Sequence, residues 1–159
     1  RSTLFPYTTL FRSVKFVGVA RCDADAILSV PVATLRRDRW GADLEEAADL
    51  VADHGAIEAV VGLPRSLGGG SSSSTRDARR WARRLASLIA PVPVRLVDER
   101  LTTVSAHQAL HEAGRRARDF RGVVDQAAAV VILEHALETE RRTGAPAGEL
   151  VPSTQGGRQ

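Results

Sequence analysis

The chain has 159 residues, of which 43% are hydrophobic, and its formal net charge is +3. This length suits one domain with a full hydrophobic core. The single cysteine, Cys22, excludes an intrachain disulfide and a zinc site built on thiolates. We find neither an apolar run long enough to span a bilayer nor a basic segment followed by a long apolar one at the start, so we expect a cytoplasmic protein.

Arginine supplies nearly all of the positive charge, because Lys15 is the only lysine. Arginine is well suited to bidentate contacts with phosphate, which would fit a nucleic-acid partner. The many alanines and the absence of asparagine favour a GC-rich genome as the source of these arginines. Composition alone is therefore weak support for binding to nucleic acid.

The first residues differ in composition from the rest of the chain. Residues 3–13 resemble the translated read of a common short-read sequencing adapter, and they include the only tyrosine and two of the four phenylalanines. We expect residues 1–13 to be foreign sequence that has replaced a natural first strand. The alternative is a natural extension that contains a short strand.

Two strands are predicted next, over residues 14–20 and 27–35. Because a short turn joins them, they should be antiparallel neighbours, and Pro31 in the second places that strand at an edge of the sheet. Asp23 and Asp25 in the turn favour backbone hydrogen bonds of the Asx type over a metal pair.

A helix and a buried strand follow. Apolar residues at helical spacing predict a helix over residues 44–54, with Asp43 as its N-terminal cap and Gly55 as its stop. Residues 57–63 form a short apolar run, interrupted only by Glu58, which is typical of a strand buried on both faces.

The segment from residue 65 to 75 is rich in glycine and serine and is predicted to be a loop that lacks the spacing of a P-loop. A helix should then run over residues 76–90, with Ala78, Trp81, Leu85 and Leu88 facing inward. Its arginines fit a solvated face and a phosphate-binding face equally well. They are Arg76, Arg79, Arg80, Arg83 and Arg84.

The strand from Val94 ends abruptly in the run Asp98-Glu99-Arg100. Carboxylates at the carboxyl end of an apolar strand suit a functional site in an α/β sheet, although a solvated turn is the commoner meaning of such a run. A helix is predicted over residues 103–113, and the arginine-rich loop over residues 115–121 is the best candidate for contact with nucleic acid.

The last helix is predicted over residues 123–142, with Asp125 in its first turn. Asp125 could simply complement the helix dipole there. Glycine, proline, serine and glutamine dominate residues 143–159, which we predict to be a disordered tail.

This order of elements predicts an α/β fold with a mixed sheet flanked by helices. Such a sheet could bring Glu99 at a strand end close to Asp125 at a helix start. Carboxylates in this arrangement bind Mg²⁺ or Mn²⁺, and two such ions can activate a water for the hydrolysis of a phosphodiester.

Three segments in the same order resemble the YqgF/RuvX family: Val60-Val61-Gly62-Leu63-Pro64, Val97-Asp98-Glu99-Arg100-Leu101-Thr102-Thr103, and the start of the last helix from Val124-Asp125 to Leu133. The resemblance covers residues 14–142. It implies an RNase H-like fold and a nuclease that matures the 5′ end of pre-16S rRNA or acts like a Holliday junction resolvase.

The resemblance also implies site residues. The family's strand-end glutamate falls on Glu99 and its helix aspartate on Asp125, so these two would be catalytic and hold Mg²⁺ or Mn²⁺. Arg100, Arg115, Arg116 and Arg118 would contact the nucleic acid. The family's first aspartate, in an Asp-x-Gly motif, falls near Phe11, where no acidic residue stands. We therefore expect this chain to have little or no nuclease activity.

Two rival interpretations stay open. A nucleic-acid-binding module without catalysis would use the same arginines together with those of residues 76–84. A small-molecule phosphotransferase of the actin-like ATPase type has a similar sheet order, but the chain offers neither a second domain nor a convincing nucleotide loop. The sequence decides neither between RNA and branched DNA nor the oligomeric state.

Overall fold

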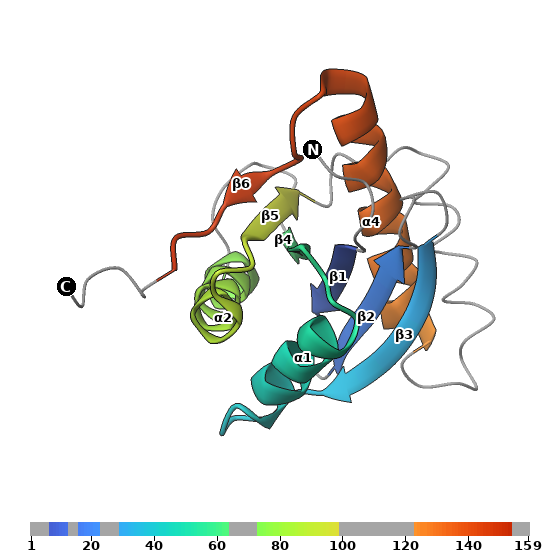
Figure 1. Ribbon diagram of the computed structural model, residues 1–159. Helices are drawn as coiled ribbons and strands as arrows, with labels where there is room; N and C mark the ends of the chain where they lie inside the picture. Colours follow the sequence, from blue (N-terminus) through green and yellow to red (C-terminus); the bar gives the residue numbers. More distant parts are fainter. Residues whose placement is uncertain (1–6, 13–15, 23–28, 64–72, 99–122, 154–159) are drawn as a thin grey trace.

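The structure is a computed structural model, and it describes residues 7–12, 16–22, 29–63, 73–98 and 123–153. Within these residues the chain forms one sheet with helices packed against it (Figure 1). The elements are β1 (Tyr7–Arg12), β2 (Phe16–Cys22), β3 (Ser29–Arg36), α1 (Ala42–Asp53), β4 (Glu58–Leu63), α2 (Ser73–Ile89), β5 (Val94–Asp98), α4 (Val123–Thr143) and β6 (Glu149–Leu150).

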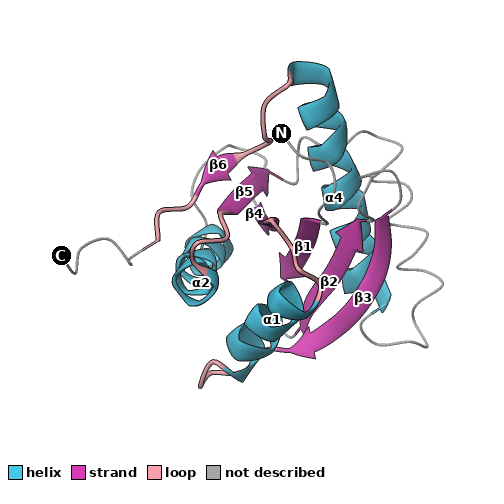
Figure 2. Ribbon diagram, in the orientation of Figure 1, coloured by secondary structure: helices cyan, strands magenta, loops and turns pink. Residues whose placement is uncertain are grey.

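The sheet is mixed, as predicted, with the strand order β3-β2-β1-β4-β5-β6. Strands β1, β4 and β5 run parallel, whereas β2, β3 and β6 are antiparallel to the strands they pair with. Figure 2 shows that the sheet is twisted and that its edge strand β3 is curved. The parallel strands β4 and β5 are connected through α2, which is the expected βαβ unit.

The hairpin of β2 and β3 confirms the antiparallel prediction, with Val17 opposite Leu35. β3 is an edge strand. An edge tolerates Pro31 because its missing N–H can face away from the neighbouring strand. The register shifts beside the proline, and Val32 has no partner in β2, so β3 carries a bulge there.

β1 lies in the middle of the sheet, between β2 and β4. Phe11 pairs with Gly18 of β2, and Leu10 pairs with Val61 of β4. The adapter-like stretch therefore does contribute a strand. Its tyrosine, threonines and phenylalanine favour extended backbone, and the hydrogen bonds of a sheet join backbone groups whatever the side chain is.

The two faces of the sheet carry separate layers of helix. Val61 and Leu96 belong to a core cluster with residues of α1 and α2. Their neighbours in sequence, Val60 and Val97, point to the other face and cluster with Ile132 of α4. Figure 1 shows α4 on the opposite side of the sheet from α1 and α2. β4 is buried along its whole length, as its apolar run predicts.

The prediction that Asp43 caps α1 is wrong. The helix begins after Gly41, and no side chain caps it at that residue. Asp43 lies in the first turn, buried, and its Oδ2 accepts a 3.0 Å hydrogen bond from the indole Nε1 of Trp81. Asp38 serves the start of the helix instead, because its Oδ2 accepts a 2.9 Å hydrogen bond from the N–H of Ala42.

α2 begins at Ser73, inside the stretch predicted to be a loop, and ends one residue before the predicted end. Ala78, Trp81 and Leu85 are buried, as predicted. The inward placement of Leu88 is wrong, because this side chain is 52% exposed. Leu88 lies near the C-terminal end of α2 and lines a surface groove between α1 and α2, so it is outside the core.

The tail predicted to be disordered from residue 143 is described as far as residue 153 and contains β6. Leu150 pairs with Arg95 of β5, and Val151 is buried. Gly148 permits this approach, since its φ is +83° and a Cβ there would collide with the backbone oxygen of Leu96.

α4 confirms the prediction of a long C-terminal helix over residues 123–142. The helix predicted over residues 103–113 lies outside the described residues, as does the arginine-rich loop after it. Among the described helices, each is too short or too polar to cross a membrane.

Candidate functional site at the carboxyl edge of the sheet

The parallel strands end together at one edge of the sheet, which we call the carboxyl edge. Leu63, the last residue of β4, pairs with Asp98, the last residue of β5. Leu10 of β1 pairs with Val61, so β1 ends beside them. β3 ends at the same edge because β2 is antiparallel to both β1 and β3. Ligands of α/β sheets bind beyond such carboxyl ends.

The first turn of α4 also lies at the carboxyl edge. The amide Nε2 of Gln126 donates a 2.8 Å hydrogen bond to Oγ1 of Thr34 in β3. Thr34 pairs with Gly18, which in turn pairs with Phe11, so this contact is level with the end of β1. Asp125 precedes Gln126 in the same turn. Its side chain lies outside the described part of the structure.

The other predicted site residues fall outside the described residues. Glu99 and Arg100 directly follow Asp98, the half-buried last residue of β5. The arginines of the predicted contact loop, Arg115, Arg116 and Arg118, are also outside it. Among the residues that are described, no group of three or more histidines, cysteines or acidic residues is placed to hold a metal ion.

The position expected for the first carboxylate is held by an apolar residue. Phe11 lies on β1, which sits between β2 and β4 at the centre of the carboxyl edge. A phenyl ring offers no oxygen to a hard cation such as Mg²⁺ or Mn²⁺. The donor set predicted for the metal is thus reduced to Glu99 and Asp125, and it lacks a third carboxylate at residue 11.

A second group of side chains lies at the same edge, where β3 passes into α1. Nη1 of Arg37 donates a 2.9 Å hydrogen bond to Asp77 of α2. Trp40 is 84% exposed, and the guanidinium of Arg39 lies 5.5 Å from the centre of its ring. Sequence reasoning missed Trp40. The one signal it carried was an aromatic residue at the end of the arginine-rich run over residues 36–40.

His135 is a titratable group on α4 with a displaced pKa. Partial burial lowers the pKa of its imidazole below the usual value, and the positive charge of Arg142 lowers it further. His135 lies nine residues after Gln126, which is roughly 13 Å farther along the helix axis. It is therefore remote from the carboxyl edge, and its titration bears on stability rather than on chemistry there.

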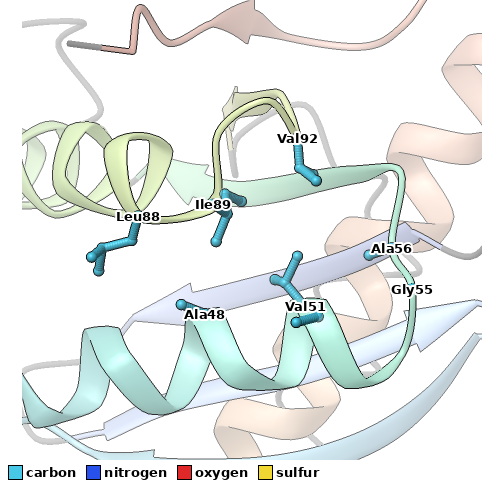
Figure 3. A pocket seen from close by; sticks show the side chains of 8 residues that line it. Ala48, Val51, Gly55, Ala56, Leu88, Ile89 and Val92 are labelled. Atoms are coloured by element: carbon cyan, nitrogen blue, oxygen red, sulfur yellow. The ribbon is translucent and has the colours of Figure 1, made fainter. Parts of the chain in front are cut away.

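An apolar groove of about 370 Å³ separates the C-terminal halves of α1 and α2. Figure 3 shows Leu88 and Ile89 of α2 facing Ala48 and Val51 of α1 across it. Its lining carries no acid, base or nucleophile. The groove lies at the ends of these helices that are remote from the carboxyl edge, so it offers no catalytic group.

Comparison with known proteins identifies the family. The sequence profile of the RuvX family, described as "Holliday junction resolvase", matches residues 14–139. A relative from Nocardioides sp. (strain ATCC BAA-499 / JS614), named "Putative pre-16S rRNA nuclease", is 52% identical over 143 residues, which are 87% of this chain and 90% of the relative. A relative of the same name from Streptomyces coelicolor is 52% identical over 84% of this chain and 80% of its own length.

Two solved structures share the fold. RuvC of Thermus thermophilus in complex with a Holliday junction substrate matches 89% of this chain and 98% of its own, with a TM-score of 0.57 and 12% identity. A second structure of Thermus thermophilus RuvC matches with a TM-score of 0.54. This likeness confirms the RNase H-like fold. Because the family profile covers most of the chain and its relatives are about half identical to it, the chain belongs to the RuvX family of nucleases.

Proposed function

We propose that the chain has the framework of a metal-dependent endonuclease that hydrolyses phosphodiester bonds in the 5′-end maturation of pre-16S rRNA. The observation that supports this proposal best is the carboxyl edge, where the ends of β1 and β5 and the first turn of α4 lie together. Glu99 follows the end of β5 in the sequence, and Asp125 lies in that first turn. The names of the relatives supply the RNA substrate.

In this proposal Glu99 and Asp125 hold Mg²⁺ or Mn²⁺ through carboxylate oxygens, which these ions prefer as ligands. The bound metal would supply an activated water and stabilise the leaving oxygen. Arg100, Arg115, Arg116 and Arg118 would contact the phosphates of the nucleic acid. Arginine suits this role because its planar guanidinium donates two hydrogen bonds to one phosphate.

The same proposal includes an impairment. The family's first aspartate falls near Phe11, and no acidic residue precedes Asp23, so the chain keeps two of three expected carboxylates. Losing one ligand weakens the affinity for the metal and the alignment of the attack on phosphorus. We expect little or no cleavage by the chain with its present sequence.

Cleavage assays with Mn²⁺ test both parts. The substrates are an RNA that spans the 5′ end of 16S rRNA and a four-way DNA junction. The Phe11→Asp variant should cleave, and a further Glu99→Gln substitution should abolish cleavage while leaving binding intact. Full cleavage by the unaltered chain would refute the impairment. A Phe11→Asp variant that binds both substrates and cleaves neither would refute the nuclease assignment.

Two alternatives have specific support. The family description and the fold of RuvC favour a branched DNA substrate, and the four-way junction assay separates it from RNA. Phe11 favours a nucleic-acid-binding module without catalysis. In that case neither Glu99→Gln nor Phe11→Asp would change the binding of nucleic acid, and neither variant would cleave it.

A further inference from the structure

Trp40 is an exposed aromatic side chain among arginines. It is 84% exposed, whereas Trp81, the other tryptophan, is 4% exposed. Arg39 lies over its ring at 5.5 Å, so one part of the indole contacts a cation and the rest faces solvent. Tryptophan is enriched at interfaces, because it offers a large apolar surface together with a polar N–H.

α2 extends this surface with a row of arginines. Arg76, Arg80, Arg83 and Arg84 are exposed, and within the described residues none of them has an acidic partner. At 100° per residue these four span about 100° of the helix circumference, starting from the side that faces α1. The guanidinium of Arg84 comes within 3.1 Å of the point where a Cβ on Gly41 would lie, so the row begins beside Trp40.

Buried and half-buried contacts hold this surface in place. Arg37 binds Asp77 at 2.9 Å and the indole of Trp81 binds Asp43 at 3.0 Å, so the start of α1 is joined to α2 on both sides of the turn. Oδ2 of Asp38 accepts a 3.1 Å hydrogen bond from the backbone N–H of Trp40 itself. The indole is therefore presented by a fixed backbone, which lowers the entropic cost of binding.

We propose that Trp40 is a stacking platform for a base of single-stranded RNA and that the arginine row on α2 holds the adjacent phosphates. Aromatic rings combined with a cationic track are the means by which proteins bind single strands without regard to sequence. Trp40 lies at the carboxyl edge, the same edge as the proposed metal site, so one strand could reach both. The RNA identity rests on the proposed function, whereas the stacking itself does not require cleavage.

The charges of α1 favour one path for the bound strand over the surface. Glu45, Glu46 and Asp49 are exposed on α1, and these carboxylates repel phosphate. On α2, the guanidinium of Arg84 lies beside Gly41, the residue after Trp40. The strand should therefore run across α2 rather than along α1.

The test is a binding measurement in EDTA, so that no metal and no cleavage are involved. A fluorescently labelled 12-nucleotide uridine RNA is titrated with the chain and followed by anisotropy. Trp40→Ala should raise the Kd between about 5-fold and about 150-fold, the range for loss of one stacked base. Trp40→Phe should stay close to the unaltered chain. Leu88→Ala is the matched control, because Leu88 is also an exposed apolar residue of the α1–α2 layer, and it should change nothing.

Intrinsic fluorescence provides a second readout. Stacking should quench Trp40, so the RNA should quench the unaltered chain, and this quenching should vanish in Trp40→Phe while the anisotropy still reports binding. Trp81 is buried and should contribute little to the quenching. Quenching that persists in Trp40→Phe would place the binding surface elsewhere and overturn the proposal.

The salt dependence of RNA binding distinguishes a specific role of the arginine row from the effect of the overall positive charge. Replacing Arg80 and Arg84 with alanine should lower the slope of log K against log salt by about 0.7 for each phosphate that is no longer neutralised. Arg142→Ala, at the far end of α4, should leave the slope unchanged. The proposal is overturned if Trp40→Ala binds the RNA as well as the unaltered chain does. It is also overturned if Trp40→Ala weakens binding to duplex RNA or polyglutamate as much as to the single strand.

Discussion

The buried hydrogen bond between Trp81 and Asp43 should contribute measurably to stability. The indole Nε1 lies 3.0 Å from Oδ2 of Asp43, and both side chains are almost completely excluded from water. Trp81→Phe removes the donor and leaves the carboxylate in place. Arg37 remains near the same oxygen, at 4.0 Å, so the charge keeps a partner but loses its direct hydrogen bond.

The magnitude follows from burial. A hydrogen bond to a charged group contributes about 1.5–3 kcal/mol, and a buried acceptor left without its donor brings the cost to the upper part of that range. The smaller phenyl ring leaves part of the site unfilled, which adds about 1 kcal/mol. We expect the free energy of unfolding to fall by about 3–4 kcal/mol in Trp81→Phe.

A double-mutant cycle isolates the hydrogen bond from the change of ring size. Chemical denaturation is measured for the unaltered chain, Trp81→Phe, Asp43→Ala and the double variant. The coupling energy should be about 1.5–3 kcal/mol, because the bond can be lost only once. A coupling below about 0.5 kcal/mol would show that this hydrogen bond contributes little to the stability of the fold and would refute this reasoning.

Two further predictions concern the C-terminal part of the chain. Gly148→Ala should lower the free energy of unfolding by about 2–4 kcal/mol, since its Cβ would meet the backbone oxygen of Leu96. Gly144→Ala, with a φ of +74° but no neighbour within 4 Å, should cost only about 1–2 kcal/mol. Equal costs in thermal unfolding would contradict the steric argument. Because the pKa of His135 is lower in the folded chain, the unfolded chain takes up the proton first, and stability should fall as pH drops through about 6.5. His135→Asn should flatten this fall in urea titrations at pH 5 to 7, and an unchanged slope would exclude His135 as its source.

The local sequence pattern predicted those elements whose apolar residues recur at the spacing of a helix or a strand. The two strands predicted on either side of a short turn, the apolar run of β4 and the helical spacing of α1 and α2 all gave elements of the right type. The positions of the parallel strand ends followed from the same pattern. Asp125 was placed in the first turn of a long helix, where it lies.

Features that depend on distant partners could not be predicted in this way. Aspartate is a residue type that often caps helices. Asp43 is instead a buried hydrogen-bond acceptor, because Trp81 of α2 packs against it. Leu150 and Val151 follow a glycine- and proline-rich segment that is typical of disorder, yet the open edge of β5 pairs with them. Trp40 lies in the turn before α1, so no periodic pattern includes it. The arginines of its proposed surface come from α2, which is distant in the sequence.

Glu99 and Asp125 are proposed to hold one divalent cation at a site that also adjoins residue 11, and binding of Mn²⁺ tests this most directly. Calorimetric titration should show tighter binding by Phe11→Asp than by the unaltered chain, since a third carboxylate joins the site. Adding Glu99→Gln or Asp125→Asn to that variant should abolish the gain. A Phe11→Asp variant that binds Mn²⁺ no better than the unaltered chain, or a gain that survives both further substitutions, would contradict the account.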